Sequence, residues 1–133
     1  MEIVMGEKEG ILLLELSGQL VAGEPASRLR AAVEEAISSG RNRLILNMAG
    51  VDYVDSSGLG ALVMAFTTAR KEGGTVKLLN LSRRNIELIV LTKLETVFEV
   101  FDDEQSAVNS FFPGREIQKF DILSFLKQRK AEE

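Results

Sequence analysis

The sequence contains no cysteine and no histidine among its 133 residues. The absence of cysteine excludes disulfides and thiolate chemistry. The absence of histidine removes the usual general base of serine and cysteine nucleophiles, and with it the commonest metal-binding side chain. Serines and scattered carboxylates alone make a poor active site, so the sequence predicts a protein that is not an enzyme and has no metal site.

Long apolar runs and an excess of positive charge are also missing. No run approaches the roughly 20 apolar residues that span a bilayer, and the start, MEIVMGEKEG, lacks the basic end and apolar stretch of a signal peptide. The net charge of −4 weighs against a nucleic-acid partner, because neutralising phosphates requires surplus lysine and arginine. With 45% hydrophobic residues, the chain is long enough for one domain with one core. We therefore expect a cytoplasmic protein with no inserted membrane segment.

The apolar patterns that are present predict the element order β-β-α-β-α-β-α-β-α. Residues 2–5 and 11–17 are typical of two strands joined by the polar turn GEKEG. Helical spacing begins at Pro25 and stops at Gly40, and the run RLILNM (43–48) is typical of a strand buried on both faces. The other expected elements are a helix from near Ser57 to Gly73, a strand at 75–81, a short helix around 86–90, a strand at 96–100 and a last helix around 107–111, with Asp102 and Gln105 at the spacing of a capping box.

This order predicts a single α/β domain with a mixed sheet of four to five strands. The N-terminal hairpin is followed by parallel βα units whose helices pack on the sheet. Parallel strands direct their C-terminal ends, and the N-termini of the helices that follow, toward one edge of the sheet. We expect the functional site at that edge.

A separate tail follows Phe112, where PGREIQKFDILSFLKQRKAEE begins with a Pro-Gly break and ends in charges. We place the domain at residues 1–112 and a C-terminal extension, helical or partly disordered, at residues 113–133. Its apolar residues suggest a helix packed on the body or on a second subunit, which makes a homodimer worth testing. These residues are Ile117, Phe120, Leu123 and Phe125.

The stretch VDYVDSSGLGALVMAF (51–66) places an acidic residue, two hydroxyls and two glycines where a strand should end and a helix should begin. With Asp55 and Ser56 at the strand end, the helix N-terminus presents unpaired N–H groups and about half a positive charge. A phosphate on Ser56 would bring a charge of about −1.5 to −2 to a position that favours anions. Gly58 and Gly60 lack a Cβ, so a partner's backbone or a phosphate can approach closely.

A purely structural interpretation of the same stretch is also open. A serine before an apolar helix is commonly an N-cap, and the two glycines then only permit close packing of helix on sheet. The spacing and the missing lysine exclude a P-loop, and the absence of Gly-x-Ser-x-Gly and of histidine argues against a nucleophile elbow.

The segment LILNMAGVDYVDSSGLGALVMAFTTARKEGGTVKLLNL strongly resembles the STAS domain of bacterial anti-sigma factor antagonists. In that family an apolar strand, a D-S-S/T-G-L/I-G turn, a helix and a Gly-Gly stop follow in this order. LTKLETVFEVFDDEQSAVNSF is similar to the family's final strand and helix, so the resemblance covers about residues 2–112. The tail is unmatched.

The resemblance implies a switch protein. In such antagonists the first hydroxyl after the Asp, Ser56 here, is phosphorylated by an anti-sigma factor that is also a serine kinase of the GHKL ATPase type. The unphosphorylated form binds that anti-sigma factor and frees its sigma factor, and a PP2C-type phosphatase restores the hydroxyl. ATP and Mg²⁺ belong to the kinase, so no cofactor is expected in this chain. The alternative is a constitutive STAS accessory subunit of a membrane transport or signalling complex, in which Ser56 is only a helix cap.

The sequence departs from the family pattern in the loop after the second strand. The family's G-E-L-D context reads GQLVAGEPASRL here, so Glu24 either substitutes for the missing acid or only favours the first turn of its own helix. Asp55 has three possible roles: helix-start electrostatics, contact to the kinase's Mg²⁺, or orientation of the Ser56 hydroxyl. The remaining expected site residues are Ser57, as a cap, and Leu59, on an exposed apolar ridge with Met64 beyond it.

Overall fold

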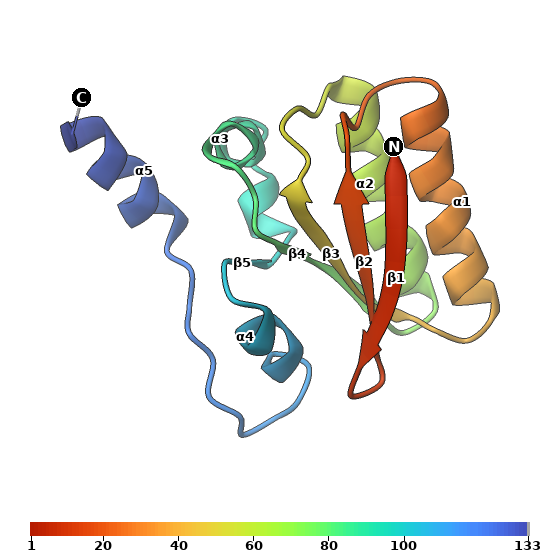
Figure 1. Ribbon diagram of the computed structural model, residues 1–133. Helices are drawn as coiled ribbons and strands as arrows, with labels where there is room; N and C mark the ends of the chain where they lie inside the picture. The colour runs from red at the N-terminus through yellow and green to blue at the C-terminus, as the bar shows by residue number, and fades with distance from the viewer. Residues whose placement is uncertain (133) are drawn as a thin grey trace.

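Five strands form one sheet in the order β1-β2-β3-β4-β5 (Figure 1). The computed structural model describes the backbone of residues 1–132 and the side chains of residues 1–127, so the last residue of the expected extension lies outside the described residues. The strands are β1 (Glu2–Lys8), β2 (Ile11–Ser17), β3 (Arg43–Gly50), β4 (Thr75–Leu79) and β5 (Val100–Phe101); the helices are α1 (Glu24–Ser38), α2 (Ser56–Lys71), α3 (Arg83–Leu91), the 3-10 turn η1 (Leu94–Thr96), α4 (Glu104–Asn109) and α5 (Ile122–Glu132). Within the described backbone only the β1–β2 pair is antiparallel, which confirms the predicted mixed α/β sheet.

The N-terminal hairpin is longer than the sequence pattern predicted. β1 continues to Lys8, which pairs with Ile11, and leaves a two-residue turn at Glu9 and Gly10. Both turn residues have positive φ, 54° and 83°, as a type I′ turn requires. The expected strand end at residue 5 was wrong because β1 is an exposed edge strand, which can carry polar residues and glycine without burying them.

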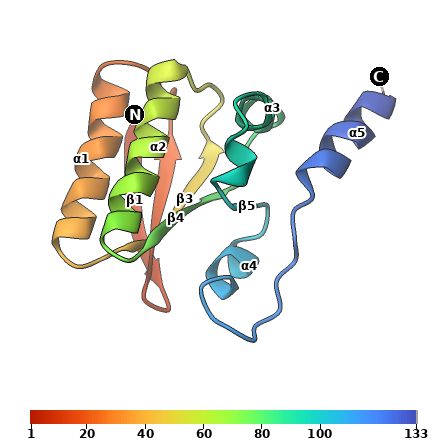
Figure 2. The same ribbon diagram turned by 180° about the vertical axis from the view of Figure 1, so that it is seen from behind.

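Helices cover both faces of the sheet, but unequally. Helices α1 and α2 lie side by side against one face, as the two opposite views show (Figures 1 and 2). Leu12, Leu14 and Leu16 alternate onto that face, whereas Ile11 belongs to a smaller cluster with α4 on the other face. The predicted burial of β3 on both faces is confirmed over residues 44–46.

The region after β4 departs most from the prediction. The strand expected at 96–100 is replaced by η1 and by the two residues of β5, which pair with Leu78 and Leu79. The β-branched pair Thr96-Val97 favoured a strand, but Phe98 turns into the α1–α2 core, where its ring meets that of Phe66 at 5.4 Å. Tertiary packing therefore overrides the local propensity.

The N-cap of α4 lies one residue later than expected. Asp103, not Asp102, accepts a hydrogen bond from the backbone N–H of Ser106 at 2.9 Å. The predicted capping box at Asp102 and Gln105 was therefore wrong. Both acids come directly after β5, so spacing alone did not distinguish them.

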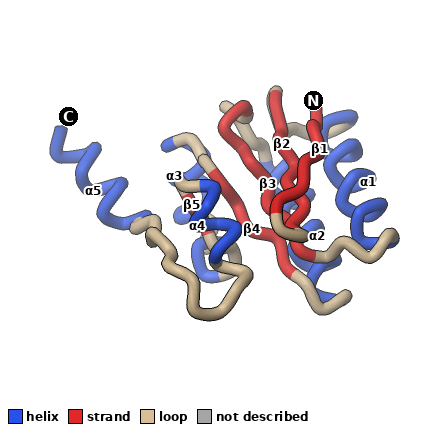
Figure 3. The backbone as a smooth tube through the Cα atoms, turned by 60° about the horizontal axis from the view of Figure 1, so that its bottom comes forward, coloured by secondary structure: helices blue, strands red, loops and turns tan. Residues whose placement is uncertain are grey.

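The C-terminal tail passes from α4 along the β5 edge to α3 (Figure 3). A helix is present as predicted, but it begins at Ile122, after Ile117 and Phe120. Asp121 sets this start, because its carboxylate accepts from the backbone N–H of Ser124 at 3.1 Å. No helix within residues 1–132 is long and apolar enough to cross a bilayer.

Candidate functional site at the start of α2

The site is built where two loops run side by side. β3 ends at Gly50, and the chain then passes along the loop that follows β2. Leu20 donates to the Tyr53 carbonyl at 2.9 Å and accepts from the Asp55 N–H at 3.2 Å. Leu20 and Val54 form an isolated parallel bridge. These bonds hold the β2–α1 loop against the first turn of α2.

Asp55 is the N-cap of α2. Its Oδ1 accepts from the Gly58 N–H at 2.8 Å, and its Oδ2 accepts from the Ala22 N–H at 3.1 Å. The interpretation of Ser56 or Ser57 as the cap was therefore wrong. The two carboxylate oxygens of Asp55 thus accept from two different segments, the first turn of α2 and the β2–α1 loop.

The cap also shifts the ionisation of Asp55. The backbone N–H groups of Gly58 and Ala22 stabilise the charged carboxylate and hold its pKa below the usual value of 3.8, and burial opposes them. Asp55 is therefore ionised at neutral pH. This geometry supports the helix-start role among the three that the sequence left open.

Ser56 and Ser57 occupy the first two positions of α2, and both are exposed. Among the described residues, neither hydroxyl has a hydrogen-bond partner. The positive end of the α2 dipole acts at these positions, because α2 is a helix of 16 residues. The result is a free primary alcohol on a rigid, positively polarised terminus.

The two glycines of the motif have different roles. A Cβ on Gly58 would lie 2.0 Å from the Leu20 carbonyl oxygen, so glycine is needed for the loop to rest on α2. A Cβ on Gly60 would meet no atom within 4 Å. The packing interpretation therefore explains Gly58, and the surface at Gly60 is open to a partner.

Two other expected site residues lie differently from the prediction. Leu59 is half-buried against the main core and does not form an exposed ridge, although Met64 is 49% exposed. Glu24 is the first residue of α1 and lies 3.8 Å from the N-terminal amine of Met1. No hydrogen bond or ion pair recorded among the described residues joins Glu24 to the start of α2. The helix-start interpretation of Glu24 therefore fits the geometry.

A cleft of about 680 Å³ opens beside Ser56, between the 53–56 loop and α3. The guanidinium of Arg84 lies 4.4 Å from the centre of the Tyr53 ring at this cleft. Asn85 is 2% exposed; its Nδ2 donates to the Val51 carbonyl at 3.0 Å, and its Oδ1 has no partner among the described residues. The α3 residues that line the cleft are Arg84, Asn85, Glu87, Leu88 and Leu91. Within the described part of the chain, no group of three or more acidic side chains could hold a metal ion.

The sequence matches the family model described as STAS domain over residues 2–107. The chain belongs to the STAS domain family. The matched region contains the whole sheet, helices α1 to α3 and most of α4, and it stops before the tail.

Curated relatives of this STAS domain include anti-sigma factor antagonists. The anti-sigma-B factor antagonist of Bacillus subtilis is 40% identical over 58 residues, which are 44% of this chain and 53% of that protein. This match thus spans about half the length of the relative. The anti-sigma F factor antagonist of Paenibacillus polymyxa is 24% identical over 81% of this chain and 92% of its own.

Solved STAS structures share the fold. The Bacillus cell fate determinant SpoIIAA in its phosphorylated form superposes with a TM-score of 0.66 at 20% identity, covering 83% of this chain and 99% of that one. A sulfate transporter family protein from Wolinella succinogenes gives 0.65 at 26% identity over 75% and 83%. The same fold thus occurs in a cell fate determinant and in a sulfate transporter family protein.

The α2 side of the site was predicted from the sequence, and the α3 side was not. The signal was available, since α3 also follows a parallel strand, β4, and its N-terminus must lie at the same edge of the sheet. SRRNIE at the start of α3 carries two arginines at that edge, and one of them, Arg84, lines the cleft beside Ser56. This STAS site therefore has two walls, α2 with its loop and α3.

Proposed function

We propose that this chain is an anti-sigma factor antagonist whose partner binding is switched by phosphorylation of Ser56. In this proposal the unphosphorylated protein binds an anti-sigma factor that is also a GHKL-type serine kinase, and a sigma factor is released. A PP2C-type phosphatase returns phosphorylated Ser56 to the alcohol. The protein acts in the cytoplasm as a binding module without catalysis of its own.

One observation carries the proposal: Ser56 is an exposed alcohol without a hydrogen-bond partner among the described residues, at the first position of a helix whose cap is a different residue. Because Asp55 performs the capping, modification of Ser56 breaks no bond that starts the helix. Relatives named as anti-sigma factor antagonists, and a structural neighbour solved in a phosphorylated form, support the same assignment.

The chemistry of the switch is electrostatic. The Ser56 Oγ takes the γ-phosphoryl group of ATP held by the kinase, ADP leaves, and the hydroxyl proton passes to a base or to solvent. The phosphorylated side chain carries a charge of about −1.5 to −2, where the unmodified hydroxyl was neutral. Burying that charge against a partner requires desolvation and suffers repulsion from any acidic group there, so binding weakens while the fold is preserved.

Incubation with the cognate kinase and ATP, followed by intact-mass measurement, tests the site of modification. We expect one phosphate on the wild type, none on Ser56→Ala and one on Ser57→Ala. Ser57 is the matched control, because it is a neighbouring exposed serine on the same turn. Phosphate on Ser56→Ala, or none on the wild type, would overturn the proposal.

A constitutive accessory subunit of a membrane transport complex is the second candidate, favoured by the similarity to a sulfate transporter family protein. Its premise that Ser56 caps α2 does not hold, since the cap is Asp55. Under this candidate, co-purification with a transport ATPase would be unaltered by Ser56→Asp. Under the proposed function, capture of the anti-sigma factor depends on the state of Ser56.

A further inference from the structure

The cleft beside Ser56 contains a cation that no described carboxylate neutralises. Three charged residues line the cleft, Asp55, Arg84 and Glu87. Both Asp55 oxygens accept backbone N–H groups, and Glu87 pairs with Arg83 at 2.9 Å on the same helix. Arg84 has only the ring of Tyr53, 4.4 Å away, as a recorded contact among the described side chains.

The position of Arg84 in its own helix is also electrostatically unfavourable. It is the second residue of α3, where the positive end of the helix dipole repels a cation and would favour an acid. The first turn of α3 contains no acidic residue. The N-termini of α2 and α3, together with Arg84, thus offer positive groups to an anion at this edge, beside the carboxylates of Asp55 and Glu87.

The Arg84 guanidinium lies over the Tyr53 ring, and no hydrogen bond from its donors is recorded among the described residues. A guanidinium contacts an aromatic face with its own face, while its five N–H groups point outward in the plane. Such a fork matches two oxygens of a phosphate, which a lysine ammonium does not. Tyr53 and Ser56 line the same cleft as Arg84. The aromatic ring, the guanidinium donors and the alcohol that takes the phosphate therefore lie in one site.

We propose that Arg84 is the intramolecular receptor for the phosphate on Ser56. The inference rests on the proposed function for the origin of the phosphate. Phosphorylation then does more than add charge to a surface, because the ion pair bridges α2 to α3 across the cleft. The phosphorylated form is a closed version of the site, and Arg84 and the cleft walls are withdrawn from a partner.

The test uses the full-length protein with phosphoserine incorporated at position 56 during translation, so that no kinase is required. The second pKa of phosphoserine is about 6, and a paired guanidinium lowers this pKa by favouring the dianion. The charged groups around the phosphate, Asp55, Arg83 and Glu87, stay constant across the variants. A ³¹P NMR titration should give a second pKa at least about 0.3 lower in the wild type than in Arg84→Gln.

Two further variants distinguish a direct Arg84–phosphate pair from a general effect of positive charge on the phosphate pKa. Arg70→Gln removes the same charge from the far end of α2, roughly 21 Å along the helix, which is more than two Debye lengths, and should leave the phosphate pKa unchanged. Arg84→Lys keeps the charge but loses the fork, so its value should lie between those of the wild type and Arg84→Gln. In the wild type the Arg84 Nε–Hε signal should move with the same pKa as the phosphate.

Equal phosphate pKa values in the wild type, Arg84→Gln and Arg70→Gln would overturn the inference, as would an Arg84 signal that does not follow the phosphate. This result is independent of the proposed function. If the kinase does not modify Ser56 in the mass experiment, the function fails even when the incorporated phosphate pairs with Arg84. If the kinase does modify Ser56 and the titrations are flat, only the Arg84 receptor fails.

Discussion

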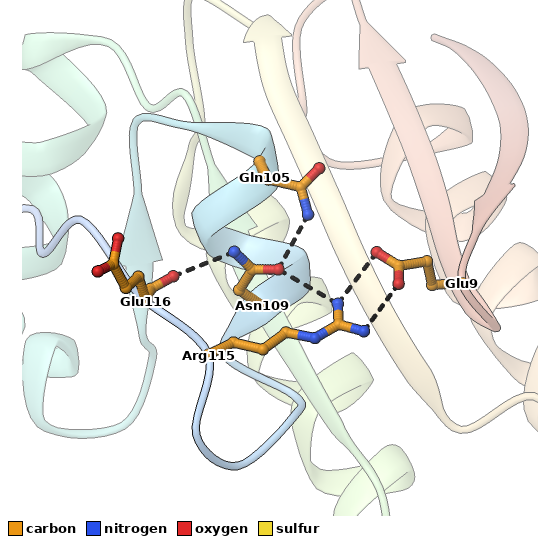
Figure 4. Close-up of polar contacts among 5 residues, drawn as sticks. All are labelled: Glu9, Gln105, Asn109, Arg115 and Glu116. Atoms are coloured by element: carbon orange, nitrogen blue, oxygen red, sulfur yellow. Dashed lines mark hydrogen bonds and ion pairs between the residues drawn. The ribbon is translucent and has the colours of Figure 1, made fainter.

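The start of α2 and the C-terminal tail are held to the same sheet in different ways. At α2, backbone lies directly on backbone, with Gly58 against the Leu20 carbonyl and Asp55 bonded to two segments. The tail is attached by looser contacts: Phe120 and Ile122 are only partly buried against the main core, and the Gln118 N–H donates to the Ser106 Oγ at 2.9 Å. The network of Figure 4 joins Arg115 to Glu9 at 2.9 Å and to Asn109 at 3.2 Å, and clefts of about 350 and 250 Å³ remain beside the tail.

The difference suggests a division between a rigid site and a less constrained extension. Close packing transmits any change at Gly58 to the fold, whereas a region with few buried contacts opens locally at little cost to the rest. A switch that works by modification needs close packing of this kind around the α2 start, because the Ser56 hydroxyl must stay at a fixed place before and after phosphorylation.

Gly58→Ala should be the most damaging small substitution at the site. The new Cβ would lie 2.0 Å from the Leu20 carbonyl oxygen and 2.8 Å from its carbon, and neither backbone atom can move without displacing the loop. We expect a loss of more than about 3 kcal/mol in the free energy of unfolding, measured by urea denaturation. Gly60→Ala is the matched control on the same helix and should stabilise by up to about 1 kcal/mol. Equal effects would refute the close-approach explanation.

Asp55→Ala should have the next largest effect. It removes the cap of α2 and the bond to Ala22, so the melting temperature should fall by about 3–6 °C. Asp121→Ala removes the corresponding cap of α5 in the tail and should change the global melting temperature by less than about 1 °C, because α5 opens locally. Similar losses from the two substitutions would mean that the tail folds cooperatively with the domain.

The pH dependence of stability should also distinguish Asp55. Because the folded protein lowers the Asp55 pKa, the carboxylate's contribution to stability is fully present above the usual value of 3.8 and is lost as the pH falls through the lower folded value. The difference in melting temperature between the wild type and Asp55→Asn should therefore be constant above about pH 5 and narrow progressively as the pH falls below about 4. A difference that widens with acid would contradict the lowered pKa.

Arg115→Gln should have the smallest effect. Its ion pair with Glu9 is partly exposed, and such pairs are screened by salt and contribute little to global stability. We expect a change in melting temperature below about 1 °C, together with faster hydrogen exchange at backbone amides of residues 115–127. A global loss as large as that of Asp55→Ala would remove the contrast between the two regions.

The fold was predictable from the sequence where patterns were long and local. The apolar runs at 11–17 and 43–48, the helical spacing from Pro25 and the Gly-Gly stop after α2 each indicate one structure, so the mixed sheet and most helices were expected correctly. The prediction failed where local signals compete. Thr96-Val97 favours a strand, but burial of Phe98 decides the conformation. GEKEG resembles a turn, but an edge strand can include most of it.

The site could be predicted from the sequence only in part, because one of its two sides carries no recognisable motif. The motif DSSGLG is recognisable in the sequence, so Asp55, Ser56 and Gly58 were predicted as site residues. Which residue caps α2 could not be predicted, because the Asp55 carboxylate also accepts a hydrogen bond from Ala22, which is distant in the sequence. Arg84 carries no motif. Its relevance comes from the parallel pairing of β3 with β4, which brings the start of α3 to the same edge.

The most direct test of the switch is the affinity of the anti-sigma factor for two forms of this protein, one with serine and one with incorporated phosphoserine at position 56. Isothermal titration calorimetry measures both under the same conditions. The account predicts tight binding of the serine form and at least about 30-fold weaker binding of the phosphoserine form, equivalent to about 2 kcal/mol. Equal affinities would contradict it.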